Sequence, residues 1–176
     1  MSIRRDVFED LFVLELANNH LGSLDRGKRI ISDFAKVVRY NNVRAAIKLQ
    51  FRDVDSFVHP AHRDRTDVRY IKKTLETKMT VADFEELTHH IVKSGCIPMA
   101  TPFDEQSVDL CVDLKMPMLK IASSDLNDWV LIEKMATTRL PVIASTGGSS
   151  LKDPVSYTHL RAHETKANLV CRLLLE

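Results

Sequence analysis

The sequence lacks the features of membrane, secreted and nucleic-acid-binding proteins. Its apolar runs are only a few residues long, so no segment can span a bilayer, and its charged N-terminus has no signal-peptide core. Its charges nearly cancel, with 25 basic against 24 acidic residues, which leaves no basic surface for nucleic acid. Three scattered cysteines show neither metal-ligand spacing nor a disulfide framework. We therefore expect a globular protein with reduced thiols, located in the cytoplasm.

Short apolar segments alternate with longer segments of helical periodicity. The predicted strands are residues 12–17, 43–50, 97–100, 117–122 and 141–144. The predicted helical regions are 24–40, 68–94, 104–114 and 127–138, and residues 52–67 are predicted to be an irregular loop. In the first helix, the predicted buried face is Ile30, Ile31, Phe34, Val37 and Val38. Thr80 and Asp83 predict an N-terminal capping box, and Gly95 predicts a helix end. The alternation favours an α/β fold of about five β/α units, either an open doubly wound sheet or part of an eight-stranded barrel.

Each predicted strand ends in polar groups, and the carboxyl ends of the strands carry the active site in β/α folds. The groups are Glu15 and Asn18-Asn19-His20, Lys48 and Gln50, Thr101-Pro102-Phe103-Asp104, Lys120 and Ser123-Ser124-Asp125, and Ser145-Thr146-Gly147-Gly148. Lys48 and Lys120 are flanked by apolar residues within their strands. A buried lysine needs a partner or a shifted pKa, and an anionic substrate would be such a partner. Hydroxyls and loop amides nearby would complete an anion site.

Five of these segments occur in an order that resembles one enzyme family. They are E-L-A-N-N-H, A-I-K-L-Q, A-T-P-F-D, L-K-I-A-S-S-D and P-V-I-A-S-T-G-G. From residue 12 to about residue 152, the sequence resembles the N-terminal barrel of the sialic acid synthase family, which includes legionaminic and pseudaminic acid synthases. Two segments depart from the family pattern: Leu16-Ala17-Asn18 replaces the usual I-G-x, and Gly147-Gly148 replaces a common G-M. These departures leave the subfamily open.

The resemblance implies an incomplete TIM barrel, with about five of its eight β/α units. It also implies condensation of phosphoenolpyruvate with an N-acetylated amino-sugar aldehyde of the N-acetylmannosamine type. Phosphate would leave, and the product would be a nine-carbon 2-keto sugar acid such as N-acetylneuraminate. By this resemblance the phosphoenolpyruvate ligands would be Lys48, Thr101, Lys120, Ser123 and Ser145. Glu15 would transfer a proton or orient water, and further substrate contacts would come from Asn19, His20 and Gln50.

The same resemblance implies a divalent metal, Mn or Mg, whose histidine ligands lie on later strands, so no metal ligand is expected within this chain. We expect the chain by itself to be inactive, and a longer parent to be a homodimer. Residues 1–153 are expected to form the partial barrel, and residues 154–176 are expected to be a non-native tail resembling a translated sequencing adapter. The alternatives are a legionaminic or pseudaminic acid synthase, a Schiff-base aldolase using Lys48 or Lys120, and a non-catalytic phosphate-binding fragment.

Overall fold

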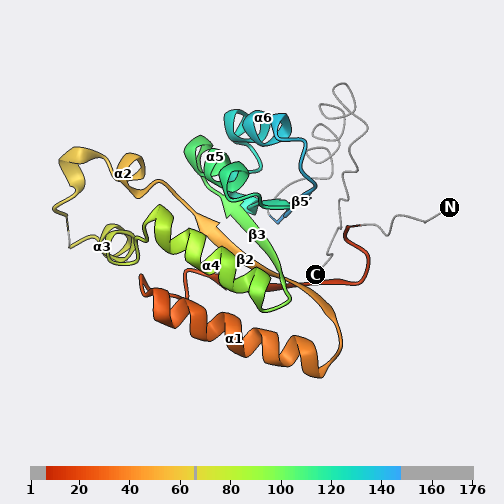
Figure 1. Ribbon diagram of the computed structural model, residues 1–176. Coiled ribbons are helices and arrows are strands. Elements are labelled where there is room, and N and C mark those ends of the chain that lie inside the picture. The colour runs from red at the N-terminus through yellow and green to blue at the C-terminus, as the bar shows by residue number, and fades with distance from the viewer. Residues whose placement is uncertain (1–6, 66, 148–176) are drawn as a thin grey trace.

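Five strands form a single parallel sheet in the computed structural model, which describes residues 7–65 and 67–147 (Figure 1). The strands are β1 (Leu11–Ala17), β2 (Arg44–Phe51), β3 (Ile97–Pro102), β4 (Leu119–Ile121) and β5 (Val142–Ala144). The α-helices are α1 (Leu24–Tyr40), α2 (Val54–Phe57), α3 (Arg69–Glu76), α4 (Val81–Lys93), α5 (Glu105–Asp113) and α6 (Trp129–Thr137). Two 3₁₀ turns are η1 (Pro60–His62) and η2 (Ser123–Asp125). Within these two ranges, none of the helices could span a lipid bilayer.

The order of the strands decides between the two α/β architectures. Each strand pairs in parallel with the next strand of the chain, in the order β1-β2-β3-β4-β5. A doubly wound sheet would reverse its order at a switch point, whereas a barrel adds strands in one direction. Figure 1 shows α1, α4, α5 and α6 following one another along the sheet in chain order. The incomplete TIM barrel is therefore confirmed.

Strand alternation gives the sheet two faces with different partners. On the outer face, Ile47, Leu49 and Phe51 are buried in one cluster with helix residues such as Ile31 and Leu87. The inner face begins with an apolar layer, which consists of Ala46, Met99 and Met118 packed with Phe8. Two residues further along the same strands come Lys48, Thr101 and Lys120. The inner face therefore has an apolar floor with a polar layer above it, at the carboxyl ends of the strands.

Most predicted helix boundaries are confirmed, because local caps set them. The Ser23 side chain accepts a hydrogen bond from the Arg26 backbone at the start of α1 (3.3 Å). Thr80 and Asp83 form the predicted capping box of α4. Gly95 ends that helix with φ +82°, a conformation that favours glycine. On α1, the prediction that Val37 is buried is wrong, since its side chain is 59% exposed.

The predicted loop 52–67 is wrong in part, because it contains α2 and η1. The Asp53 side chain accepts a hydrogen bond from the Asp55 backbone (3.1 Å) and so caps α2. The predicted helical region 68–94 is two helices, α3 and α4. Thr77 ends α3 and Thr80 starts α4, so the short segment between them lets the two helices take different directions.

Ala17 has φ +48°, at a β-bulge where the register of β1 against β2 shifts. This left-handed conformation costs an alanine about 1 kcal/mol, whereas glycine adopts it readily. We predict that Ala17→Gly raises the free energy of unfolding by about 0.5 kcal/mol or more, measured by urea denaturation. The matched control is Ala82→Gly on the exposed face of α4, which should lower it by about 0.5–1 kcal/mol. A loss of stability in Ala17→Gly would contradict this explanation.

Candidate active site

One carboxylate bridges two lysines in the polar layer of the inner face. Glu15 at the end of β1 places one oxygen 2.8 Å from Nζ of Lys48 and the other oxygen 3.7 Å from Nζ of Lys120. Lys48 also donates a hydrogen bond to Oγ1 of Thr101 (2.9 Å). Four strands from β1 to β4 thus bring four predicted site residues together. Both ammonium groups face the same space, as an anion pocket requires.

Lys48 is the most deeply buried charged group of this cluster, with 1% of its side chain exposed. Lys120 is 22% exposed and Glu15 is 50% exposed. Burial lowers the pKa of Lys48, the hydrogen bond and charge of Glu15 oppose this shift, and the charge of Lys120 adds to it. Lys48 and Lys120 carry two positive charges and share the single negative charge of the half-exposed Glu15. One positive charge therefore remains to attract a second anion.

The lowered pKa of Lys48 predicts how stability depends on pH. Its value lies below the 10.5 of an unfolded lysine, so between the two values the unfolded chain binds more protons than the folded chain. The free energy of unfolding contributed by this group therefore rises with pH across that window. We predict that Lys48→Met removes this rise, which urea denaturation at pH 8, 9 and 10 would measure as a flatter profile. Parallel profiles for both proteins would contradict the assignment.

The predicted serines lie at the ends of β4 and β5. Ser123 begins η2 and is exposed, and a Cβ atom added to Gly147 would lie 3.6 Å from the Ser123 Cβ. Ser145 is half-buried, and its backbone N–H donates to the carbonyl of Ile121 (3.1 Å). The two strand ends therefore lie against each other beside Lys120. The roles of Ser123 and Ser145 as phosphoenolpyruvate ligands stay predictions.

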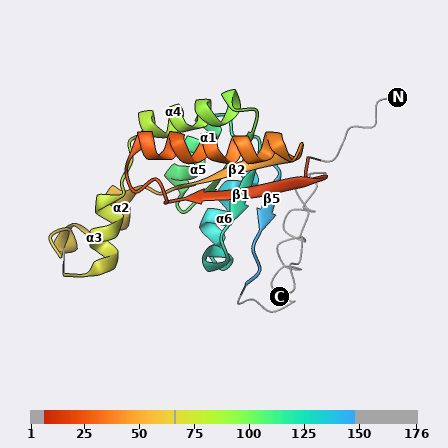
Figure 2. The same ribbon diagram turned by 90° about the horizontal axis from the view of Figure 1, so that it is seen from below.

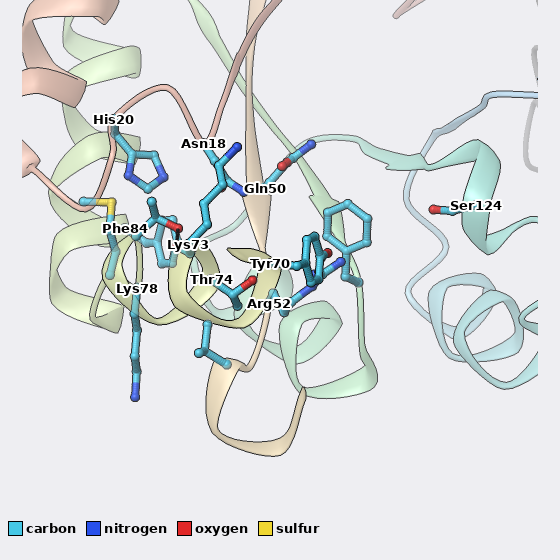
Figure 3. Close-up of a pocket in the computed structure, with 14 residues that line it drawn as sticks. Asn18, His20, Gln50, Arg52, Tyr70, Lys73, Thr74, Lys78, Phe84 and Ser124 are labelled. Carbon is cyan, nitrogen blue, oxygen red and sulfur yellow. Dashed lines mark hydrogen bonds between the residues drawn. The ribbon is translucent and has the colours of Figure 1, made fainter. Parts of the chain in front are cut away.

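A pocket of about 310 Å³ opens beyond the ends of β1 and β2 (Figure 3). Figure 2 shows α2 and α3 beyond the carboxyl ends of these strands. The lining side chains are Asn18, His20, Gln50, Arg52, Val54, Tyr70, Lys73, Thr74, Thr77, Lys78, Met79, Phe84, Phe103 and Ser124. Two of the predicted substrate contacts, His20 and Gln50, line this pocket. Asn19 does not; its side-chain amide donates to the Leu16 carbonyl (2.9 Å), and its neighbour Asn18 takes the lining position.

His20 is buried, with 1% of the residue exposed. Its Nδ1 accepts a hydrogen bond from the Gly22 backbone (3.0 Å), so Nε2 carries the proton of a neutral ring. Burial lowers the pKa of His20, and the charge of Asp83 opposes this. Nε2 has no hydrogen-bond partner among the described residues. A buried N–H without a partner is costly, and a ligand oxygen in the pocket would satisfy it.

The sequence pattern does not single out Arg52, because this residue begins the predicted loop 52–67. Arg52 directly follows the last residue of β2, and it lines the same pocket as Gln50. The Arg52 guanidinium lies 4.2 Å from the ring centre of Phe57 and 4.3 Å from that of Phe103. One more step of the period of two that identified Lys48 and Gln50 would have identified Arg52.

The described residues supply no metal site, since no group of three or more His, Cys, Asp or Glu side chains lies close together among them. Cys96 and Cys111 are buried free thiols, and burial raises the pKa of the Cys111 thiol. Cys171 and the predicted non-native tail lie outside the described residues.

Comparisons with known proteins agree with this geometry. A family profile described as the NeuB family matches residues 40–172. The chain is 42% identical over 155 residues to the pseudaminic acid synthase of Helicobacter pylori, covering 82% of this chain and 44% of that protein. It is 33% identical over 133 residues to an uncharacterised protein of Methanocaldococcus jannaschii, covering 76% of this chain and 36% of that protein.

The crystal structure of a protein from Chromobacterium violaceum, described as spore coat polysaccharide biosynthesis protein E, superposes with a TM-score of 0.83. Its sequence is 34% identical, and the match covers 88% of this chain and 46% of that one. The chain therefore spans less than half the length of each of these proteins.

Proposed function

The chain belongs to the NeuB family, and from that premise we propose that it forms the phosphoenolpyruvate-binding part of a sugar acid synthase. The reaction joins C3 of phosphoenolpyruvate to the aldehyde carbon of an N-acetylated amino sugar. Water adds at C2 and phosphate leaves, so the product is a nine-carbon 2-keto sugar acid. N-acetylneuraminate is the product we propose first, with legionaminic and pseudaminic acids as alternatives.

One observation carries the proposal: Glu15 already spans the two ammonium groups of Lys48 and Lys120. Phosphoenolpyruvate has two anionic groups, a carboxylate and a phosphate, and we propose that each takes one lysine. Thr101 fixes Nζ of Lys48 from the adjacent strand, so this donor is in place before the substrate arrives. Fixed charges of this kind stabilise an anion without reorganisation during the reaction.

We propose that Glu15 acts on the proton or water of the reaction, since its carboxylate is half-exposed and can turn from the lysines toward the substrate. Joining two polar reactants requires charge neutralisation and orientation more than a protein nucleophile. Ser123 and Ser145 are proposed as further hydrogen-bond donors to the phosphate. A divalent metal, Mn or Mg, is proposed for the longer protein only, because the described residues do not supply its ligands, and no step above depends on it.

The test is calorimetric titration of the chain with phosphoenolpyruvate, with and without Mn²⁺, followed by addition of N-acetylmannosamine and measurement of released phosphate. We expect saturable phosphoenolpyruvate binding that does not need the metal. Failure to bind phosphoenolpyruvate would overturn the proposal. Binding without phosphate release would indicate that the chain holds the donor but lacks the rest of the catalytic site.

A Schiff-base aldolase is the competing enzyme, because a lysine of lowered pKa is also the group that such an enzyme needs. Borohydride reduction in the presence of pyruvate separates the two. A covalent adduct on Lys48 or Lys120, detected by mass spectrometry, would favour the aldolase and count against the synthase.

A further inference from the structure

Glu15 is an anionic partner that the chain itself supplies to both lysines of the candidate site. Its carboxylate oxygens lie 2.8 Å from Nζ of Lys48 and 3.7 Å from Nζ of Lys120. Phosphoenolpyruvate also carries a carboxylate, and its oxygens would make the same charge-assisted contact with an ammonium group. The side chain and the proposed substrate therefore require the same place beside Lys48.

The burial of Lys48 decides which of its neighbours moves when a new anion reaches it. Its side chain is 1% exposed, so Nζ gains a further partner only if a present neighbour moves away. Thr101 accepts a hydrogen bond from Nζ (2.9 Å) and is itself buried, with 1% of the residue exposed. Glu15 is 50% exposed, so its carboxylate can turn into solvent without becoming a buried charge. Glu15 is therefore the neighbour that gives way.

The charges of the cluster lead to the same conclusion. Lys48 and Lys120 carry two positive charges, and Glu15 neutralises one of them. Phosphoenolpyruvate brings both a carboxylate and a phosphate, which exceed the one positive charge that remains while Glu15 stays in place. Two carboxylates on one ammonium group also repel each other, and burial limits the screening of this repulsion. The departure of Glu15 removes both obstacles.

From these contacts we infer that Glu15 is an internal competitor of phosphoenolpyruvate, which holds the place of the substrate carboxylate on Lys48 until the substrate displaces it. The inference rests on the proposed function, which supplies phosphoenolpyruvate as the ligand, and it adds a form of regulation to the same site. Lys120, with its longer contact to Glu15, takes the phosphate. Displacement also frees the oxygens of Glu15, so this residue acts on a proton or water only after phosphoenolpyruvate has bound.

The test is calorimetric titration of Glu15→Gln with phosphoenolpyruvate. Glutamine keeps the length of the side chain and removes its charge, so we expect phosphoenolpyruvate to bind about tenfold more tightly than to the unsubstituted chain. The matched control is Glu76→Gln on α3, which removes the same charge from a carboxylate that pairs with Lys72 (3.8 Å). This control should leave the affinity unchanged.

A double substitution tests whether the competition takes place at Lys48. Glu15→Gln is added to Lys48→Met, and phosphoenolpyruvate affinity is compared with that of Lys48→Met alone. The gain should fall below about threefold, because the contact that Glu15 blocks no longer exists.

A free carboxylate tests whether Glu15 acts by occupying a position. In Glu15→Ala, acetate should take the place of the missing carboxylate and weaken phosphoenolpyruvate binding competitively, whereas chloride at the same ionic strength should not. In the unsubstituted chain, where Glu15 already lies beside Lys48, acetate should have no more effect than chloride.

Four results would each overturn the inference: unchanged or weaker binding in Glu15→Gln, an equal gain in Glu76→Gln, an equal gain in the Lys48→Met background, or equal effects of acetate and chloride on Glu15→Ala. The proposed function fails separately, if the unsubstituted chain does not bind phosphoenolpyruvate. A chain that binds phosphoenolpyruvate with the same affinity before and after Glu15→Gln keeps the proposed function and loses this inference.

Discussion

Lys48→Met is expected to weaken phosphoenolpyruvate binding by at least about 100-fold, because it removes a buried charge-assisted donor from the anion pocket. Methionine keeps the length and the apolar stem of lysine. Glu15 retains Lys120 and solvent as partners, so the substitution leaves no buried charge unpaired. Removal of a buried charge can be neutral or stabilising, and we expect the free energy of unfolding to change by less than about 1 kcal/mol.

Calorimetric titration with phosphoenolpyruvate and urea denaturation measure these two effects on the same samples. The matched control is Lys36→Met on α1, where the lysine is exposed and pairs with Asp33, and both quantities should stay unchanged. Unchanged phosphoenolpyruvate affinity in Lys48→Met would reject the site. A large loss of stability together with loss of binding would show that Lys48 is a structural residue.

Asp104→Ala is expected to lower the free energy of unfolding by about 2–3 kcal/mol, because one carboxylate makes two connections. One oxygen accepts from the Ser107 backbone and caps α5, and the other accepts from the Asp53 backbone, both at 2.7 Å. The second bond ties the start of α5 to the segment that follows Arg52.

Urea denaturation of Asp104→Ala is to be compared with that of Asp128→Ala, whose carboxylate caps only α6 through Leu131 (3.1 Å). In the control Asp128→Ala, the free energy of unfolding should fall by about 1 kcal/mol, which is the usual contribution of an N-cap. Asp104→Asn keeps one acceptor oxygen, so its loss in free energy of unfolding should lie between those of Asp104→Ala and Asp128→Ala. Equal losses in Asp104→Ala and Asp128→Ala would show that the bond to Asp53 contributes nothing.

The clustering of the core residues of the candidate site could be predicted because they stand at regular positions on short strands. Lys48 and Lys120 interrupt apolar strands, and parallel strands end at one edge of a sheet, so the pattern predicted that the two side chains would meet. The bond from Lys48 to Thr101 and the shared carboxylate of Glu15 agree with that prediction. The sequence could not show which asparagine lines the pocket. Asn18 and Asn19 are adjacent, so no periodicity distinguishes them.

Local chemistry in the sequence determined the elements of this protein: caps such as Thr80 and Gly95 set the helix ends, and alternation along β2 set which side chains face inward. These signals act within a few residues and depend little on the rest of the chain. The tertiary structure alone decided that the sheet is part of a barrel, because strand order depends on which distant segments pair. It also decided the pocket beyond the ends of β1 and β2, because Arg52, Tyr70 and Lys73 come together only when α3 lies beyond the end of β2.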